Sequence, residues 1–234
     1  MKAIRLLAAL VVGALLYQGG QAVYRSESLK LETFEVVGNT EDRVPDAEVV
    51  KATGKQVGDH LLGVSTKKVA LALQELPWIA EAKVERILPS TLKITVRERK
   101  AAMVVESGQG PFLVDANGLV LQQGSEDLVT VTDLPLEQVV PGDRITTPEF
   151  AHSARILRSL PDEIRVKVSA IRAPSIDQIQ IETGGGPTIF YGAAEQIPEK
   201  NFAAETLFSG AAAGTAGVGV IDVRVPSRPA TRAR

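Results

Sequence analysis

The chain has no cysteine, only two histidines and few aromatic residues. Without cysteine it can form no disulfide and no thiolate metal site, and it has no thiol nucleophile. His60 and His152 fall in different predicted domains, and neither an HExxH nor a GxSxG motif is present, which argues against a histidine metal site or a catalytic triad. The formal net charge is −2, which argues against a nucleic-acid partner bound by an overall basic field.

The remaining patterns that carry chemistry in other proteins predict ordinary turns and loops here. Asp115–Gly118 begins like a calcium loop, but Leu119–Leu121 supplies no further oxygen ligands and no glutamate closes it. The glycine-rich stretches 184–186 and 210–219 lack the Lys-Ser/Thr of a phosphate-binding loop. Acidic residues are too scattered to form a carboxylate pair. We therefore expect no catalytic residue, no metal, no cofactor and no small-molecule substrate.

A long apolar run stands near the N-terminus, at Leu6–Val23. Its 18 residues would make a helix of roughly 27 Å, close to the about 30 Å of a bilayer's hydrocarbon core. Lys2 and Arg5 precede the run, so the N-terminus should stay inside and the rest of the chain should be exported. The small residues of Gly20–Ala22 also fit a cleavage site. The residues alone leave a retained anchor and a cleaved signal peptide open, and both place the chain after Arg25 outside the cytoplasm.

The most strongly patterned stretch is residues 76–99, which predicts two strands joined by a tight turn at Leu88-Pro89-Ser90. Apolar and charged residues alternate in both halves, as is typical of half-buried strands, and acids of the first half can face bases of the second. Pro77 and Trp78 lie where a preceding helix should end. We expect Pro77, Trp78 and Pro89 to be structural, with Trp78 sealing the joint between helix and sheet rather than stacking on a sugar or peptide.

The segment before this hairpin predicts one strand and two helices. The strand is Leu31–Val37, closed by the structural glycine Gly38. The first helix is Pro45–Thr53, and the second runs from Ser65 or Thr66 to Leu76 with one apolar stripe. The order strand, helix, helix, strand, strand predicts a small α+β domain at residues 31–99, with two helices on one face of a sheet.

A second domain is predicted at residues 100–225, a mixed β-rich domain with helices packed on the sheet. Its last strand is Val218–Val225, and residues 226–234 are predicted to be a flexible arginine-rich tail because Pro226 and Pro229 should stop regular pairing. If Ile221–Val225 lies at the sheet edge, its backbone is a template for an added strand from a partner, and the arginines would attract an acidic segment or anionic lipid. Alternatively, the strand is paired inside the sheet and the tail is solvated.

Several motifs together resemble the FtsQ/DivIB family of bacterial cell-division proteins, in its order of anchor, POTRA domain and β-domain. The first domain carries FEVxGN at residues 34–39 and LPWIAxAxVxRxLPxTLxIxVxER at residues 76–99, and the second carries LVDxxGLV at 113–120, LP at 134–135 and VIDVR at 220–224. The likeness covers about residues 6 to 226. It favours a retained anchor over a cleaved signal.

The resemblance implies a non-enzymatic, single-pass protein of the cytoplasmic membrane at the division septum, with its C-terminal domains outside. Residues 1–5 would be a short cytoplasmic tail, 6–24 the transmembrane helix, 31–99 the POTRA domain beside the membrane and 100–225 the β-domain. Its partners would be the single-pass coiled-coil proteins FtsB (or DivIC) and FtsL, with FtsB adding a strand at the C-terminal edge. The implied partner-binding residues are Ile221, Asp222, Val223, Arg224, Val225 and Arg228.

Two other classes remain as alternatives. One is a POTRA-containing transport or outer-membrane assembly factor that uses its sheet edge as a chaperone does. The other is an exported enzyme acting on the cell wall, which the lack of a catalytic constellation disfavours.

Overall fold

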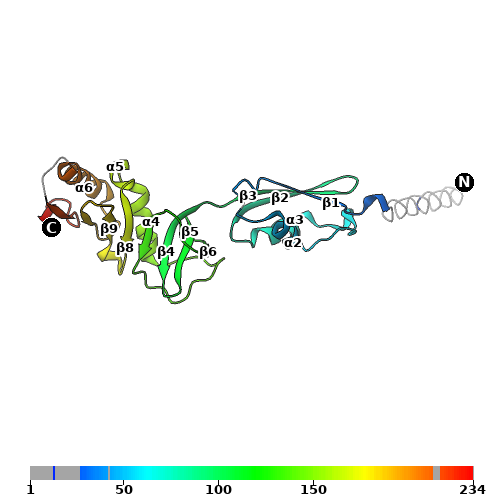
Figure 1. The fold of residues 1–234 in the computed structure, drawn as a ribbon, viewed down its shortest axis with the longest axis horizontal. Helices are drawn as coiled ribbons and strands as arrows, with labels where there is room; N and C mark the ends of the chain where they lie inside the picture. The colour runs from blue at the N-terminus through cyan, green and yellow to red at the C-terminus, as the bar shows by residue number, and fades with distance from the viewer. Residues whose placement is uncertain (1–12, 14–26, 42, 213–216, 234) are drawn as a thin grey trace, which may run out of the picture. The chain divides into compact units, whose positions relative to one another are not determined.

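The computed structural model describes residues 13, 27–41, 43–212 and 217–233, and the chain divides into two compact units, Met1–Arg99 and Lys100–Arg234 (Figure 1). The predicted cytoplasmic tail and transmembrane helix lie outside the described residues, apart from Gly13. None of the helices built by the described residues combines the length and the apolar character needed to cross a membrane.

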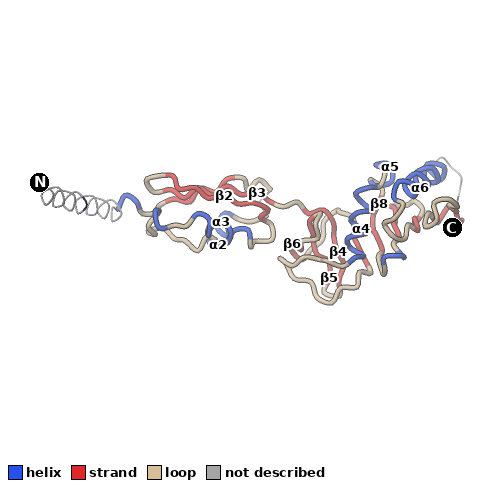
Figure 2. The backbone as a smooth tube through the Cα atoms, turned by 180° about the vertical axis from the view of Figure 1, so that it is seen from behind, coloured by secondary structure: helices blue, strands red, loops and turns tan. Residues whose placement is uncertain are grey.

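The first unit is a three-stranded sheet with two helices on one face (Figure 2). Its elements are η1 (Glu27–Leu29), β1 (Thr33–Val37), α2 (Asp46–Ala52), η2 (Leu61–Gly63), α3 (Thr66–Gln74), β2 (Ile79–Ile87) and β3 (Thr91–Glu98). The strand order is β1-β3-β2, with β1 parallel to β3 and β2 antiparallel to it. The predicted order strand, helix, helix, strand, strand is confirmed.

Local chemistry explains these elements. Ser65 caps α3, its hydroxyl accepting the backbone N–H of Lys68 at 3.5 Å, and the helix buries Val69 and Leu73 against the sheet. Trp78 is buried at the start of the hairpin, under the Arg43 guanidinium 4.8 Å from its ring centroid. The Trp78 side chain thus packs inside the first unit, between the end of α3 and the start of β2.

The solvent face of the hairpin carries the expected pairing of acid and base. Glu81 lies opposite Arg97 in the register, and Arg97 Nη2 donates to Glu81 Oε1 at 2.5 Å. The hydrogen bond from Arg97 lowers the pKa of Glu81. Both side chains are exposed, so this pair adds little to stability.

The second unit is built on one nine-stranded mixed sheet, in the order β12-β11-β10-β9-β8-β7-β4-β5-β6. The strands are β4 (Ala101–Ser107), β5 (Gly110–Asp115), β6 (Val120–Gln123), β7 (Thr130–Thr132), β8 (Val168–Arg172), β9 (Gln180–Thr183), β10 (Thr188–Phe190), β11 (Val218–Asp222) and β12 (Ala230–Ala233). The helices are α4 (Pro148–Ser159), α5 (Asp162–Arg165), η3 (Ile176–Gln178) and α6 (Ile197–Ala212). Together with the first unit, this sheet confirms the α+β class.

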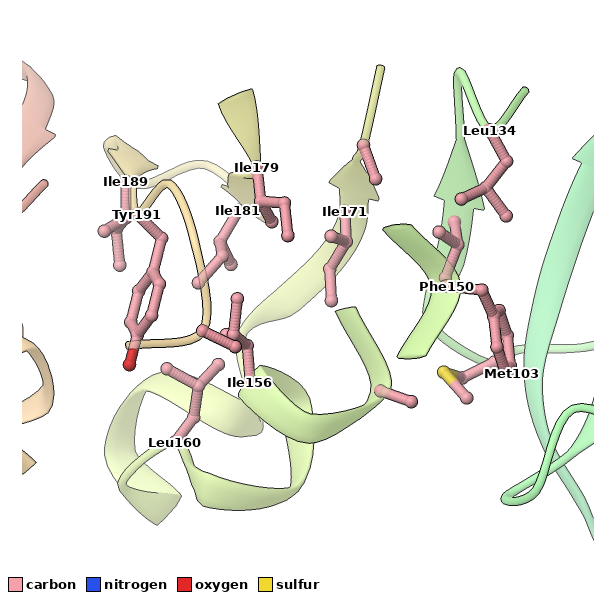
Figure 3. Close-up of a cluster of buried hydrophobic side chains, with 14 of the residues drawn as sticks. Met103, Leu134, Phe150, Ile156, Leu160, Ile171, Ile179, Ile181, Ile189 and Tyr191 are labelled. Atoms are coloured by element: carbon pink, nitrogen blue, oxygen red, sulfur yellow. The ribbon is translucent and has the colours of Figure 1, made fainter. Parts of the chain in front are cut away.

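One continuous hydrophobic core joins the sheet of the second unit to its helices. Ile156 of α4 and Leu160, just after it, lie beneath Ile181 of β9 and the Tyr191 ring (Figure 3). The core continues to α6, which contacts α4, α5 and β11. Helix α6 is thereby held beside the last strands of the chain (Figure 1).

The C-terminal segment differs from its prediction as a flexible tail. Residues Ala230–Ala233 form a strand, β12, which pairs antiparallel with β11. The chain turns back between the two strands, where Arg228 N–H donates to the carbonyl of Val225 at 3.0 Å. Pro226 and Pro229 lie in this turn and not in either strand, so they cost no ladder hydrogen bond.

Two further boundaries differ from their predictions. Strand β11 ends at Asp222 rather than at Val225. Helix α6 continues to Ala212, into the glycine-rich stretch 210–219 that was predicted to be a loop.

Candidate functional site

The predicted partner strand does not lie at the edge of the sheet. Strand β11 pairs on one side with β10, in parallel, and on the other with β12. Ile221 and Val223 are fully buried, and Val223 N–H donates to the carbonyl of Phe190 at 3.0 Å. The prediction of Ile221–Val225 as an edge is therefore wrong, because the residues expected to be a tail return and cover it.

Within the described sheet, β12 is the outermost strand at this end. All four of its residues are exposed. In an antiparallel pair, alternate residues direct their backbone N–H and C=O groups away from the partner strand, here toward the outer side of β12. The C-terminal edge that a partner strand can extend is thus β12, one strand further along the chain than predicted.

An apolar groove of about 490 Å³ lies beside this edge, between α6 and the turn that precedes β12. Phe202, Ala203 and Leu207 of α6 line one side, and Pro226 and Pro229 line the other. The Phe202 side chain is 73% exposed, which is unusual for a large aromatic group and marks the groove as a place for an apolar ligand group. Neither the groove nor Phe202 was predicted, because its two walls are far apart in the sequence.

Buried polar contacts hold α6, and with it the groove, against the sheet. Lys200 Nζ donates to the carbonyl oxygens of Tyr191 and Ala193 at 3.0 and 2.8 Å. The Tyr191 hydroxyl donates to Asn201 Oδ1 at 2.9 Å, and Asn201 Nδ2 donates to the carbonyl of Ser159 at 2.6 Å. Burial lowers the pKa of Lys200 and raises that of Tyr191. This network fixes the N-terminal part of α6, where Phe202 lies.

The end of β11 carries a bidentate ion pair. Arg224 donates from Nε to Asp222 Oδ1 at 3.0 Å and from Nη2 to Asp222 Oδ2 at 2.6 Å, and its guanidinium lies 5.7 Å from the centroid of the Phe190 ring. These hydrogen bonds lower the pKa of Asp222 and raise that of Arg224. Arg228 in the turn and Arg232 on β12 are two further positive charges at this end of the sheet.

The six residues implied by the resemblance therefore have different positions. Ile221 and Val223 are core residues, and Asp222 and Arg224 form the ion pair. Val225 is exposed at the start of the turn, and Arg228 closes that turn. Val225 and Arg228 directly precede the groove residues Pro226 and Pro229 in the chain, whereas the buried side chains of Ile221 and Val223 can act only by holding β11 in place.

The residues considered for metal chemistry build ordinary structure. Asp115 Oδ1 accepts the backbone N–H groups of Asn117 and Leu119 at 2.8 and 2.9 Å, which makes the predicted turn. His152 Nδ1 accepts the N–H of Ala194 at 3.2 Å. In the part of the chain that is described, no three His, Cys, Asp or Glu residues gather in a way that would hold a metal ion.

Comparison with known proteins covers both units. The family "POTRA domain, FtsQ-type" matches residues 29–99. The chain is 29% identical to the cell division protein FtsQ of Streptomyces coelicolor over 97% of its length and 88% of that protein. It is also 29% identical to FtsQ of Mycolicibacterium smegmatis over 82% of the chain, and 24% identical to FtsQ of Corynebacterium glutamicum over 76%.

The share of the relatives that is matched varies. The chain spans 78% of the Corynebacterium protein but only 56% of the Mycolicibacterium protein. The similarity nevertheless includes the POTRA domain and, for the Streptomyces protein, extends over most of the second unit. On these grounds the chain belongs to the FtsQ family of cell division proteins, which are non-enzymatic membrane proteins of the division site.

Proposed function

We propose that this protein is a divisome scaffold that holds a coiled-coil pair of the FtsB (or DivIC) and FtsL type by strand addition at β12. In this proposal residues 6–24 are the anchor in the cytoplasmic membrane, residues 31–99 the POTRA domain, and the second unit, from Lys100 on and including β12, the β-domain outside the cytoplasm. The observation that carries the proposal is that β12 is the outermost strand of the described sheet and is exposed along its whole length.

Strand addition suits this edge because its outward backbone groups supply affinity without any particular side chain. Native proteins usually protect such edges with prolines, bulges or charges. Here the prolines stand in the turn before β12, and Arg232 is the charged residue on the strand. The edge is therefore still able to pair with an extended segment.

The groove supplies the specificity that backbone pairing lacks. A strand added to β12 would place alternate side chains on the side where α6 lies, and one apolar side chain would fit between Phe202 and Pro229. Arg228 and Arg232 favour acidic residues in the same partner segment. The proposed partner segment is thus extended, acidic and carries one large apolar side chain.

The direct test is photo-crosslinking in living cells from single positions of the full-length chain. A photoreactive residue at Arg232 or at Phe202 is expected to capture a small single-pass coiled-coil protein, identified by mass spectrometry. Val140 is a matched control, because it is exposed and apolar but lies in the loop that pairs with β6, at the opposite end of the sheet. Equal capture from Val140, or no adduct from either test position at normal expression, would contradict strand addition here.

A further inference from the structure

The first unit has one end at which three strands meet. Thr33 at the start of β1 and Ile87 at the end of β2 are both register partners of Thr91, which begins β3. The incoming chain is attached at this same end. The backbone N–H of Glu32 donates to the carbonyl of Ser90 in the hairpin turn at 2.8 Å, and Lys30 forms a β-bridge with His60.

This end concentrates exposed apolar side chains. Leu88 at the hairpin tip is 61% exposed and Ile87 beside it 47%, while Val57 in the adjoining loop and Leu62 in η2 are 64% and 38% exposed. Arg86 Nη1 donates to the carbonyl of Leu62 at 3.2 Å, which ties η2 to the hairpin. We call Val57, Leu62, Ile87 and Leu88 the apolar tip.

The clustering of exposed apolar side chains is specific to this end of the first unit. Six large apolar side chains are exposed in the described part of the first unit, and four of them belong to the apolar tip. The other two are Val37, at the far end of β1, and Leu71, on α3. A hairpin turn is ordinarily polar, so two adjacent bulky apolar residues there indicate an interaction surface.

The covalent chain limits where the apolar tip can be. The apolar run of the sequence ends at Val23, and four residue steps, each at most about 3.6 Å, lead to Glu27 at the start of η1. Glu27 therefore lies within about 14 Å of the end of that run. With the run in the bilayer, the end of the unit to which Glu27 leads faces the lipid headgroups.

We infer that the apolar tip inserts into the interface of the outer leaflet and holds the POTRA unit against the membrane. The inference rests on the proposed anchor at residues 6–24, but not on strand addition at β12. This end carries charged side chains of both signs, Lys30 and Arg86 against Glu27, Glu32 and Asp59, and Lys30 pairs with Glu27 at 2.7 Å. Insertion is therefore driven by apolar burial and does not need anionic lipid.

The absence of cysteine makes the test direct, because any introduced cysteine is the single labelling site. The full-length chain is reconstituted into phosphatidylcholine nanodiscs with an environment-sensitive fluorophore at Leu88→Cys or Ile87→Cys. Val37→Cys is the matched control, an exposed apolar position on the same sheet four residues along β1 from Thr33. A label at Ala14→Cys reports whether the apolar run itself lies in lipid.

The inference predicts blue-shifted emission at positions 87 and 88, quenched by doxyl-labelled lipid and unchanged in 0.5 M salt, with water-like emission at position 37. Lipid contact at 14 together with water-like emission at 87 and 88 overturns the apolar tip and leaves the anchor standing. Water-like emission at 14 overturns the anchor and the tip together. A blue shift without lipid quenching, seen only when two copies share a disc, assigns the tip to self-association and also overturns the inference.

Discussion

The Tyr191 hydroxyl, buried in the core, donates a hydrogen bond of 2.9 Å to Asn201 Oδ1 on α6. Asn201 in turn donates to the carbonyl of Ser159, so this one amide joins the sheet, α4 and α6. Replacing it with alanine leaves a buried hydroxyl and a buried carbonyl without their partner.

We therefore expect Asn201→Ala to lower the free energy of unfolding of the second unit by about 1–3 kcal/mol. The measurement is urea unfolding of the full chain followed by circular dichroism. Phe202→Ala, at the adjacent exposed position, is the control and should change stability by less than about 0.5 kcal/mol. Equal effects of the two substitutions would show that the amide does not fasten α6.

A second prediction concerns Gly38, which has φ +93° and lies against β3. A Cβ at this position would be 2.1 Å from the carbonyl oxygen of Val96, which is backbone and cannot move aside. Gly38→Ala should therefore destabilise the first unit by about 3–5 kcal/mol, as a clash added to strain. Trp78, the only tryptophan, lies in this unit, so its fluorescence reports the transition.

Gly54→Ala is the control for the prediction at Gly38. Gly54 also has a positive φ, +61°, but a Cβ there meets nothing within 4 Å. It should cost only about 1–2 kcal/mol, the strain of the left-handed conformation. If Gly54→Ala proved as harmful as Gly38→Ala, contact with Val96 would not be the cause.

These residues also show what could be predicted from the sequence. The hairpin at residues 76–99 follows from the alternation of apolar and charged residues, which is a local signal. Gly38 was expected to close a strand, but its contact with Val96 joins segments far apart in the chain. Periodicity cannot reveal such a contact.

The candidate site was predicted less well for the same reason. The order of the nine strands depends on parallel pairings between distant segments, such as β4 with β7 and β10 with β11. Pro226 and Pro229 were interpreted as the end of pairing, whereas they bound a turn that returns the chain as β12. The edge strand is therefore β12, one strand further along the chain than predicted. The groove against α6 could be recognised only in the folded structure.

The same correction changes what a proline at position 223 should do. Val223 is fully buried, and its N–H donates to the Phe190 carbonyl. We expect Val223→Pro to lower the stability of the second unit by about 3 kcal/mol or more, so that any loss of partner binding follows from unfolding. Thermal unfolding by circular dichroism checks this, and an unchanged melting temperature would mean that position 223 is peripheral after all.

The Asp222–Arg224 pair predicts a dependence of stability on pH. The pKa of Asp222 is lowered in the folded protein because Arg224 donates hydrogen bonds to its carboxylate. The stabilisation is therefore complete above the unfolded-state pKa, about 3.9, and is lost as pH falls through the lower folded-state value. Asp222→Asn should flatten the melting temperature of the second unit between about pH 4 and pH 2, relative to the unmodified chain. An equally steep fall in the variant would assign the acid sensitivity to other carboxylates.

The last prediction separates the groove from the strand edge. Phe202 is exposed and contributes little to folding, so Phe202→Ala should leave the free energy of unfolding within about 0.5 kcal/mol of the unmodified chain. If a partner side chain sits against its ring, the affinity for the purified coiled-coil pair should fall by roughly 10- to 100-fold, as expected for an aromatic anchor at an interface. Val166→Ala is the matched control, because Val166 is 77% exposed in the same unit but does not line the groove. Calorimetric titration of each full-length variant in detergent would measure its affinity for the coiled-coil pair. An unchanged affinity in Phe202→Ala, together with capture from Arg232 in cells, would leave strand addition in place and remove the groove from the interface.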